Sequence, residues 1–215
     1  PPPQAPSPDD LYILYTGGTT GMPKGVLWRQ ADIFAAALGG RRLDGSEFES
    51  REEIAAHCQA APPRKVLIGA PLMHGAAQWV SFSMWMLGAA LVYPSEVKRL
   101  DPDEFWSTAE RERVTGISIV GDAFARPLLD QLERKSYELS QLVSIGSGGA
   151  PLSLAHKRAF LARFPKASIY DGMGSSEGGA QGMNVSSNKH GVSTGNFQTA
   201  RGSVVISEDL TRVLP

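Results

Sequence analysis

Short apolar runs alternate with longer amphipathic segments along most of the chain. The apolar runs predict strands at 11–16, 66–68, 90–93, 116–120, 142–145, 167–170 and 203–206. The segments between them predict helices at 30–38, 47–60, 75–88, 101–113, 122–135 and 153–164. Strands that alternate with helices of this length indicate βαβ units. We therefore predict an α/β fold with a mainly parallel sheet and flanking helices.

In such a sheet, ligands bind beyond the carboxyl ends of the strands. Glycine-rich turns follow the predicted strands at 11–16, 142–145 and 167–170, so we expect these turns to meet at that edge. Beyond residue 171 the chain is rich in Gly, Ser and Asn, and we expect loops there until the strand at 203–206. Asp101-Pro102-Asp103-Glu104 predicts a helix start in which Asp101 is the N-cap and Glu104 closes a capping box.

Composition and charge narrow the classes of function. The 215 residues are 42% hydrophobic and 20% charged, and a formal net charge of −1 gives no electrostatic basis for binding nucleic acid. The single cysteine, Cys58, excludes an internal disulfide, and residues 1–8 form a Pro-rich lead-in without a signal-peptide pattern. The most apolar segment, 76–90, is interrupted by polar residues and is too short to span a hydrocarbon core of about 30 Å. We expect a cytoplasmic protein that is not transmembrane.

The strand at 11–16 leads into a loop of small and hydroxyl side chains. Glycines let the backbone approach a ligand closely, and successive N–H groups in such a loop form an anion-binding concavity. Threonine hydroxyls add neutral donors, and a lysine adds a point charge suited to phosphate. The spacing differs from G-x-x-x-x-G-K-[ST], because this lysine follows a proline and precedes a glycine. We predict polyphosphate binding by Thr16, Gly17, Gly18, Thr19, Thr20, Gly21 and Lys24.

Two further segments of small residues follow predicted strands. Ser147-Gly148-Gly149-Ala150-Pro151-Leu152-Ser153 joins a strand to a helix, where small residues often serve only tight packing. Asp171-Gly172-Met173-Gly174-Ser175-Ser176-Glu177 places carboxylates beside hydroxyls. Mg²⁺ prefers such oxygen ligands and usually keeps several waters alongside substrate phosphates. The second segment therefore predicts a magnesium ligand.

Together these segments resemble the adenylate-forming enzymes, the superfamily of acyl-CoA synthetases, luciferases and peptide-synthetase adenylation domains. Residues 12–26 resemble the phosphate-binding signature Y-T-S-G-T-T-G-x-P-K-G-V, with Gly17 where the family usually has Ser. Residues 147–153 resemble a run that lines the adenine and the acyl end of the substrate tunnel. Residues 174–177 stand at the G-x-T-E of the family's Y-G-x-T-E motif. The Tyr of that motif commonly stacks on adenine, and Met173 replaces it here.

The resemblance implies a role for each matching residue. Lys24 and Glu177 would be catalytic, Ser176 would contact the α-phosphate, and Glu177 with Thr20 would hold the magnesium ion. Pro71-Leu72-Met73-His74 resembles the P-x-x-H segment that gates the acyl tunnel, so His74 and Gly149 would contact the acyl substrate. Adenine and AMP would be bound by Gly148, Gly149, Ala150, Pro151, Asp171, Gly172, Met173, Gly174 and Ser175.

The activity implied is that of a fatty-acid or sterol-acid CoA ligase. A carboxylic acid and ATP would give acyl-AMP and pyrophosphate, and the acyl group would then pass to CoA, with Mg²⁺ as the metal. The resemblance covers only the middle of a family member. We therefore expect 9–215 to be part of the adenylate-forming N-terminal domain, without the C-terminal domain and incapable of turnover alone. Apolar surface left by an absent domain predicts self-association, with a homodimer as one form.

Two alternatives remain open. Gly174-Ser175-Ser176-Glu177-Gly178 satisfies G-x-S-x-G, the nucleophile elbow of α/β-hydrolases, with Ser176 as the nucleophile. Against it, Gly178-Gly179 opens a helix poorly, and His190 precedes Asp209 whereas the hydrolase order requires the acid first. The other alternative is a non-catalytic module that kept the nucleotide-binding scaffold and lost the chemistry.

Overall fold

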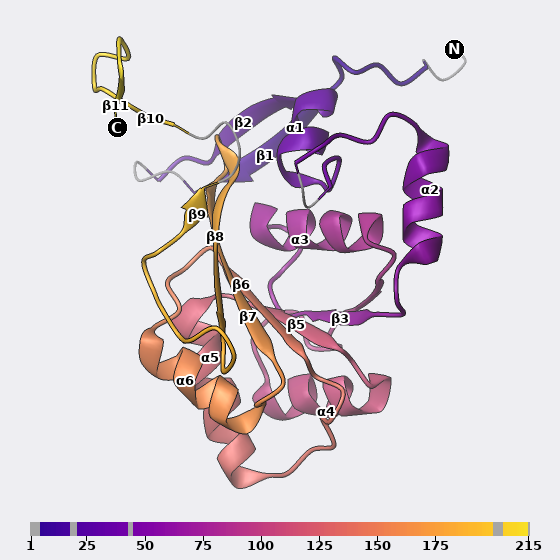
Figure 1. Cartoon of the computed structure of the whole chain (residues 1–215), viewed down its shortest axis with the longest axis vertical. Helices are drawn as coiled ribbons and strands as arrows, with labels where there is room; N and C mark the ends of the chain where they lie inside the picture. Colours follow the sequence, from indigo (N-terminus) through magenta and orange to yellow (C-terminus); the bar gives the residue numbers. More distant parts are fainter. Residues whose placement is uncertain (1–4, 18–20, 43–44, 200–203, 215) are drawn as a thin grey trace.

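The computed structural model describes residues 5–17, 21–42, 45–199 and 204–214 (Figure 1). Its helices and strands are β1 Leu11–Thr16, β2 Lys24–Arg29, α1 Gln30–Ala37, α2 Arg51–Ala60, β3 Lys65–Ile68, α3 Gly75–Met86, β4 Ala90–Val92, α4 Pro102–Glu112, β5 Gly116–Ile119, α5 Gly121–Arg134, β6 Ser144–Gly148, α6 Leu154–Arg163, β7 Ser168–Ser175, β8 Gly179–Ser187, β9 Gln198–Thr199, β10 Val205–Ile206 and β11 Val213–Leu214. From β3 to β7 the strands and helices alternate as predicted, with bounds that shift by a few residues.

A seven-stranded sheet organises the described chain. Its strand order is β4-β3-β5-β6-β7-β8-β9, parallel from β4 to β7 and antiparallel from β7 to β9. Helices α4, α5 and α6 cover one face, and α3 covers the β3 side of the other face (Figure 1). The predicted α/β class with a mainly parallel sheet and flanking helices is confirmed.

The larger core lies between the sheet and helices α4 to α6. Phe105 and Trp106 of α4 are fully buried there, and the Trp106 indole donates to the carbonyl of Leu128 at 2.8 Å. Strand side chains from alternate positions, such as Ile117 and Ile145, complete this core. The sheet is therefore held on one face by a continuous apolar layer.

Helix α4 begins where the sequence predicts. The Asp101 carboxylate accepts hydrogen bonds from the N–H groups of Asp103 and Glu104, as an N-cap does. The capping box is not closed, however. Glu104 instead accepts from the N–H of Ser95 and from the hydroxyl of Thr108, so its carboxylate ties the preceding loop to the helix.

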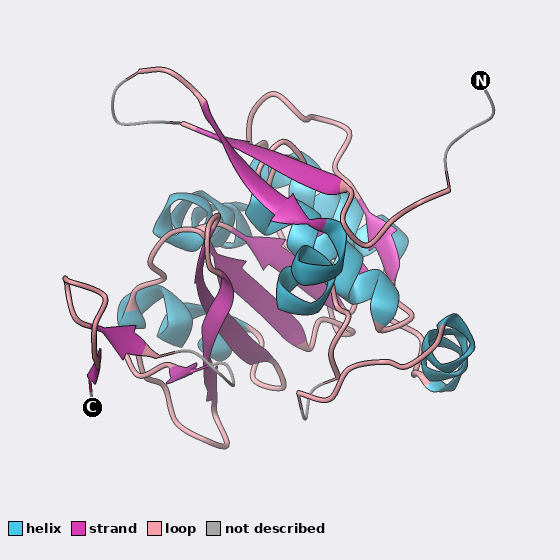
Figure 2. Ribbon diagram, turned by 90° about the horizontal axis from the view of Figure 1, so that it is seen from above, coloured by secondary structure: helices cyan, strands magenta, loops and turns pink. Residues whose placement is uncertain are grey.

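The strand at 11–16 does not join the parallel sheet, contrary to the prediction. β1 pairs with β2 in a separate antiparallel hairpin, in register from Leu11 opposite Arg29 to Thr16 opposite Lys24. Figure 2 shows this hairpin lying apart from the sheet. β2 was missed because it starts inside the glycine-rich signature, whose composition indicates a loop rather than a strand.

Residues 171–175 and 179–187 of the Gly, Ser and Asn-rich stretch are strand rather than loop. β7 continues through Ser175 and turns directly into β8, with Asp171 opposite Asn184 and Gly172 opposite Met183. The expectation of loops was wrong because the ladder is made by backbone groups, which small and polar residues supply as well as apolar ones. β6 likewise starts at Ser144 and runs through Gly148, two to three residues later than predicted.

The predicted strand at 203–206 is short. Its described part, β10, pairs only with β11, in a hairpin that stands away from the sheet in Figure 1. Val205, Leu210 and Val213 of this hairpin are exposed. Over the described ranges, no helix has the length and apolar character needed to cross a bilayer.

Candidate functional site

The turn between β7 and β8 carries Ser176 and Glu177. The N–H of Gly178 closes it by donating to the carbonyl and hydroxyl oxygens of Ser175, at 3.2 and 3.0 Å. Gly179 has a φ of +70° and is buried against α1, where a Cβ atom would lie 3.1 Å from that of Ala36. Only glycine combines this backbone conformation with such close packing. The turn is therefore fixed on α1 while its tip stays exposed.

Glu177 lies at that exposed tip. No described residue makes a hydrogen bond or ion pair with its carboxylate. Nor do the described residues contain a cluster of three His, Cys, Asp or Glu side chains that could hold a metal ion by themselves. An uncommitted carboxylate nevertheless fits Mg²⁺, which is bound through one or two carboxylates, waters and substrate phosphates.

The hairpin of β1 and β2 presents the predicted phosphate loop. Thr16 and Lys24 are paired at the end of the hairpin where the loop joins the two strands, and the Thr16 hydroxyl donates to the carbonyl of Lys24 at 3.5 Å. Gly17, Gly21 and Lys24 are exposed, whereas Gly18, Thr19 and Thr20 lie outside the described residues. The hairpin is attached to the β7–β8 turn, because the Trp28 indole donates to the carbonyl of Ser176 at 2.8 Å.

The segment with His74 lies beside the glycine-rich segment after β6. Gly149 has a φ of +78°, and a Cβ atom there would lie 3.8 Å from the Cβ of Ala76 in the first turn of α3. His74 precedes this turn and is exposed, without capping the helix through its side chain. A Cβ atom at Gly75 would lie 2.6 Å from Leu14 of β1. The two residues predicted to contact the acyl group are therefore neighbours, next to the hairpin.

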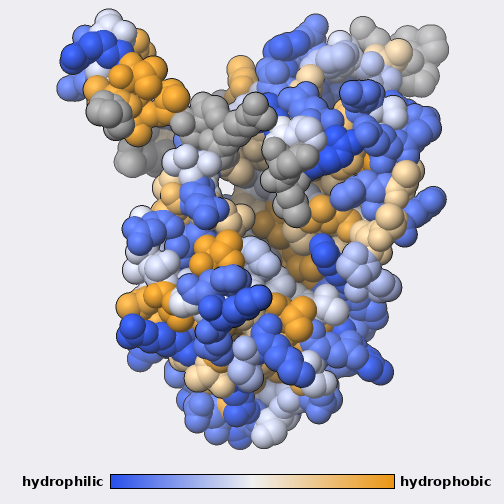
Figure 3. Space-filling view, viewed as in Figure 1, coloured by the Kyte–Doolittle hydropathy of each residue, from blue (hydrophilic) through white to orange (hydrophobic). Residues whose placement is uncertain are grey.

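The strands beside them present a floor of glycines. On the face of the sheet that α3 shares, β6 and β7 carry Gly146, Gly148 and Gly172, with Gly148 directly opposite Gly172. Among the described residues, a Cβ atom at Gly148 or Gly172 would have only a neighbouring strand carbonyl within 4 Å, at 3.6 Å, so these positions have room for a side chain. Tyr170 and Met183 flank this floor, about two-fifths exposed. Figure 3 shows a recess with hydrophobic residues in its depth on one side of the molecule.

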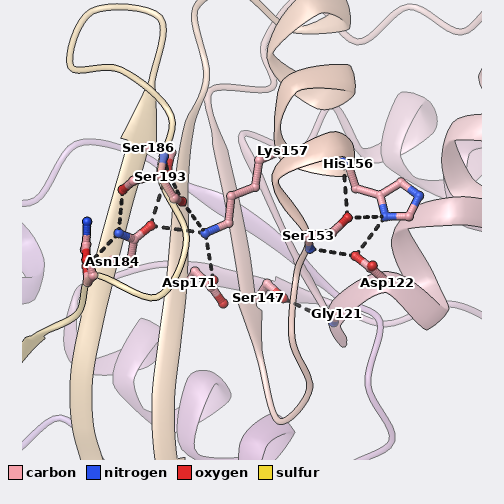
Figure 4. A network of polar contacts seen from close by, with 11 residues as sticks. Gly121, Asp122, Ser147, Ser153, His156, Lys157, Asp171, Asn184, Ser186 and Ser193 are labelled. Carbon is pink, nitrogen blue, oxygen red and sulfur yellow. Dashed lines mark hydrogen bonds and ion pairs between the residues drawn. The ribbon is translucent and has the colours of Figure 1, made fainter.

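The start of α5 is hydrogen-bonded to the glycine-rich segment 147–153, which contains Gly149. The N–H of Gly121 donates to the hydroxyl of Ser147 at 3.1 Å, and the N–H of Asp122 donates to the carbonyl of Pro151 at 3.0 Å. The Asp122 carboxylate also accepts from the N–H of Ser153 and lies 2.8 Å from Nδ1 of His156 (Figure 4). Sequence reasoning missed Asp122, whose position at a helix start indicates only a favourable charge.

We expect stability to depend on pH through Asp122. Burial raises the pKa of this carboxyl, but the hydrogen bonds from Ser153 and His156 outweigh burial and hold the pKa below its usual range. The stabilisation is therefore present above the usual carboxyl pKa of about 4 and is lost as the pH falls through the lower folded value. Asp122→Ala should reduce the unfolding free energy at about pH 7 and have less effect at about pH 2. Urea denaturation checks this, and an equal loss at both pH values would contradict it.

The Asp171 side chain points away from the glycine floor. Its carboxylate forms a buried ion pair with Lys157 of α6, at 2.8 Å. Any contact of Asp171 with adenine would therefore use its backbone. Glycine is also required at position 174 for a structural reason, because a Cβ atom there would overlap the carbonyl oxygen of Gly179. Met173 is partly exposed near the turn.

The hydrolase prediction for Ser176 is wrong. A nucleophile elbow is a sharp turn from a strand into a helix. Here the G-x-S-x-G segment turns from β7 into the antiparallel strand β8, and the Ser176 carbonyl is bound by Trp28. His190 follows on the far side of β8, beside Ser187, so the segment lacks the architecture of an elbow.

Comparison with known proteins decides the family. The chain matches the family model described as AMP-binding enzyme over residues 1–204. The chain belongs to this family. Among its relatives, medium-chain acyl-CoA ligase Mig of Mycobacterium avium is 45% identical, and the match covers 100% of this chain and 39% of that protein. The 3-oxocholest-4-en-26-oate–CoA ligase of Rhodococcus rhodochrous is 39% identical over 83% of this chain and 33% of its own length. The chain thus spans 39% or less of these two relatives.

Solved structures share the fold. The inhibitor-bound N-terminal domain of FACL13 from Mycobacterium tuberculosis superposes with a TM-score of 0.61 at 24% identity, over 81% of this chain and 39% of that one. The peptide-synthetase protein PA1221, with adenylation and carrier domains, gives 0.62 at 22% identity, over 86% and 34%. The resemblance to adenylate-forming enzymes is confirmed.

Proposed function

We propose that this chain takes part in the ATP-dependent activation of a carboxylic acid, first to acyl-AMP and then to acyl-CoA. One observation carries the proposal: the predicted segments adjoin one another. Trp28 attaches the phosphate hairpin to the Ser176–Glu177 turn, and Gly149 lies beside the helix that follows His74. Segments 70 to 150 residues apart in sequence are therefore in contact, which supports a site that they share.

In this proposal, polar groups of the hairpin and the turn bind the triphosphate. Lys24 supplies a positive charge where the loop joins β2, and the loop N–H groups and hydroxyls supply neutral donors. Ser176 contacts the α-phosphate, and Glu177 holds Mg²⁺, with Thr20 as a further ligand. When bound, the metal neutralises charge that develops on the phosphates during transfer. The protein's contribution is positioning and electrostatic stabilisation rather than covalent catalysis.

The glycine floor is proposed to hold the adenosine and the start of the acyl chain. Gly148 and Gly172 leave room for a flat or elongated ligand. Ala150, Pro151, Met173 and Ser175 of the adjoining segments are proposed to contact adenosine as the resemblance implies. His74 and Gly149 lie at the acyl end. The names of the relatives favour medium-chain fatty acids or sterol-type acids as substrates, and CoA as the acceptor.

The decisive experiment is carboxylate-dependent ATP–pyrophosphate exchange with a panel of medium-chain, long-chain and sterol acids. We would assay this chain and the corresponding protein of the length of Mig. We expect exchange by the longer protein and none by this chain, because the chain covers 39% of Mig. The best acid in the panel would name the substrate class. Absence of exchange by the longer protein with every acid would refute the ligase proposal and favour a non-catalytic nucleotide-binding module.

A cytoplasmic location and a homodimer belong to the same proposal. The single cysteine supports a reducing compartment. Exposed apolar side chains on the outer face of the β1–β2 hairpin, such as Ile13, Tyr15 and Leu27, support self-association. Light scattering at rising concentration should show a growing mass, and a constant monomer mass would contradict this part.

A further inference from the structure

One pair of directly opposed residues in the β1–β2 hairpin reaches two separate parts of the proposed site. Tyr12 and Trp28 are cross-strand partners. The Trp28 indole donates to the carbonyl of Ser176 at 2.8 Å. The Tyr12 hydroxyl donates to the side-chain oxygen of Gln78 on α3, and the Gln78 amide donates to the carbonyl of Leu72 at 2.7 Å. The hairpin is therefore hydrogen-bonded to the β7–β8 turn through Trp28. It is also hydrogen-bonded, through the side chain of Gln78, to the segment that contains His74.

The inner face of the hairpin is built for this double attachment. Leu14, two residues after Tyr12, is buried and packs against Gly75, the residue that follows His74. Residues of the opposite face, including Leu11, Ile13 and Leu27, are exposed. The Tyr12 hydroxyl is protonated at neutral pH, as for any tyrosine, and burial raises its pKa further. Both attachments therefore come from one rigid two-stranded element.

We propose that Tyr12 and Trp28 are positioning residues that couple the acyl-acid segment at Leu72–His74 to the MgATP turn at Ser176–Glu177. This inference rests on the proposed function. A displacement of the acid segment would move Tyr12 through Gln78, and Trp28 opposite it would move the turn that carries Glu177. Such coupling is reciprocal: bound acid raises the affinity for MgATP as much as MgATP raises the affinity for acid.

The test removes each donor and leaves an aromatic side chain, which is the same ring at position 12 and a smaller one at position 28. Trp28→Phe and Tyr12→Phe are made singly and together in the protein of the length of Mig, and pyrophosphate exchange gives the KM for ATP at low and at saturating acid. We expect the ratio of the two KM values to fall toward one by about two- to tenfold, the range for one lost hydrogen bond. The KM ratio of the double variant should be no lower than that of either single variant, because both residues act through one hairpin.

Tyr93→Phe is the matched control. Tyr93 donates to the hydroxyl of Ser81 on the same helix α3, at 3.1 Å, but contacts neither segment. If Tyr12 or Trp28 had only a structural role, its variant would lower kcat or stability and leave the KM ratio unchanged, which is the result that we expect for Tyr93→Phe. An unchanged ratio in Trp28→Phe, or effects of Tyr12→Phe and Trp28→Phe that add, would overturn the inference.

A second measurement separates this inference from the proposed function. Amide hydrogen exchange is compared in wild type and Trp28→Phe of the present chain at residues 174–179 and, for Tyr12→Phe, at 72–75. We expect faster exchange in the segment that each variant releases. If the longer protein shows no acid-dependent exchange of pyrophosphate, the proposed function fails. Faster amide exchange would then still support the positioning contact, and unchanged amide exchange would overturn it.

Discussion

Lys157→Met should lower the unfolding free energy by about 3–5 kcal/mol, the largest loss of stability that we expect from a single substitution. The Lys157 ammonium is completely buried and uses its three protons on Asp171, Asn184 and the carbonyl of Ser193, at 2.8, 3.1 and 2.9 Å (Figure 4). Methionine keeps the length of the stem but leaves the Asp171 carboxylate buried without a counter-charge. Urea denaturation at neutral pH measures the loss.

Two control variants isolate the cause of this loss. Lys157→Met combined with Asp171→Asn removes both charges at similar volume and should recover most of the stability. Lys135→Met removes a lysine that is 2.6 Å from Asp103, with both side chains about half exposed, and should change stability far less than Lys157→Met. Equal losses in Lys157→Met and Lys135→Met would contradict the assignment of a buried ion pair.

This ion pair also ties together segments that carry the proposed site. Lys157 lies on α6, directly after the Gly149 segment, whereas Asp171 begins the stretch of β7 that leads to Glu177. Asn184 extends the network by donating to the hydroxyl of Ser193 and the carbonyl of Asn196. The floor of the recess is therefore fixed from the opposite face of the sheet, where the network is buried.

The repeating part of the fold could be predicted from sequence, because each βαβ unit carries its own signal. Apolar runs such as Ile117–Ile119 and a capped helix such as that after Asp101 are local patterns. β2 and β8 were missed because their pairing is set by a partner strand, which composition does not reveal. Their small and polar residues indicate loops when they are considered alone.

The candidate site was predictable only as far as its motifs extend. Glycines, Lys24 and Glu177 were found through the resemblance, whereas Trp28, Asp122 and Lys157 act through distant partners. A local signal existed for Lys157, which lies three and four residues before the buried Phe160 and Leu161. A lysine on the apolar face of a helix indicates a buried partner, but the sequence alone does not name Asp171.

Gly172→Val should abolish or strongly weaken substrate binding without destabilising the protein. Gly172 does not adopt a positive φ, and an added Cβ atom would meet only the carbonyl of Ser147, at 3.6 Å. A β-branched residue in a strand restricts the unfolded chain, so the unfolding free energy should stay level or rise by about 0.4–1 kcal/mol. The added methyl groups would fill the recess instead. We expect KM for the acid or for ATP to rise at least tenfold, about 1.4 kcal/mol, in the exchange assay of the longer protein.

Gly174→Ala is the matched control, two residues along the same strand. Its Cβ atom would overlap the carbonyl of Gly179, so the turn itself must shift and stability should fall together with exchange activity. Gly172→Val and Gly174→Ala thus separate two reasons for glycine in one motif. Glycine at 172 is needed only if a ligand occupies the recess, whereas glycine at 174 is needed for the turn itself. A Gly172→Val protein with both KM values within twofold of wild type would show that the glycine floor does not bind substrate.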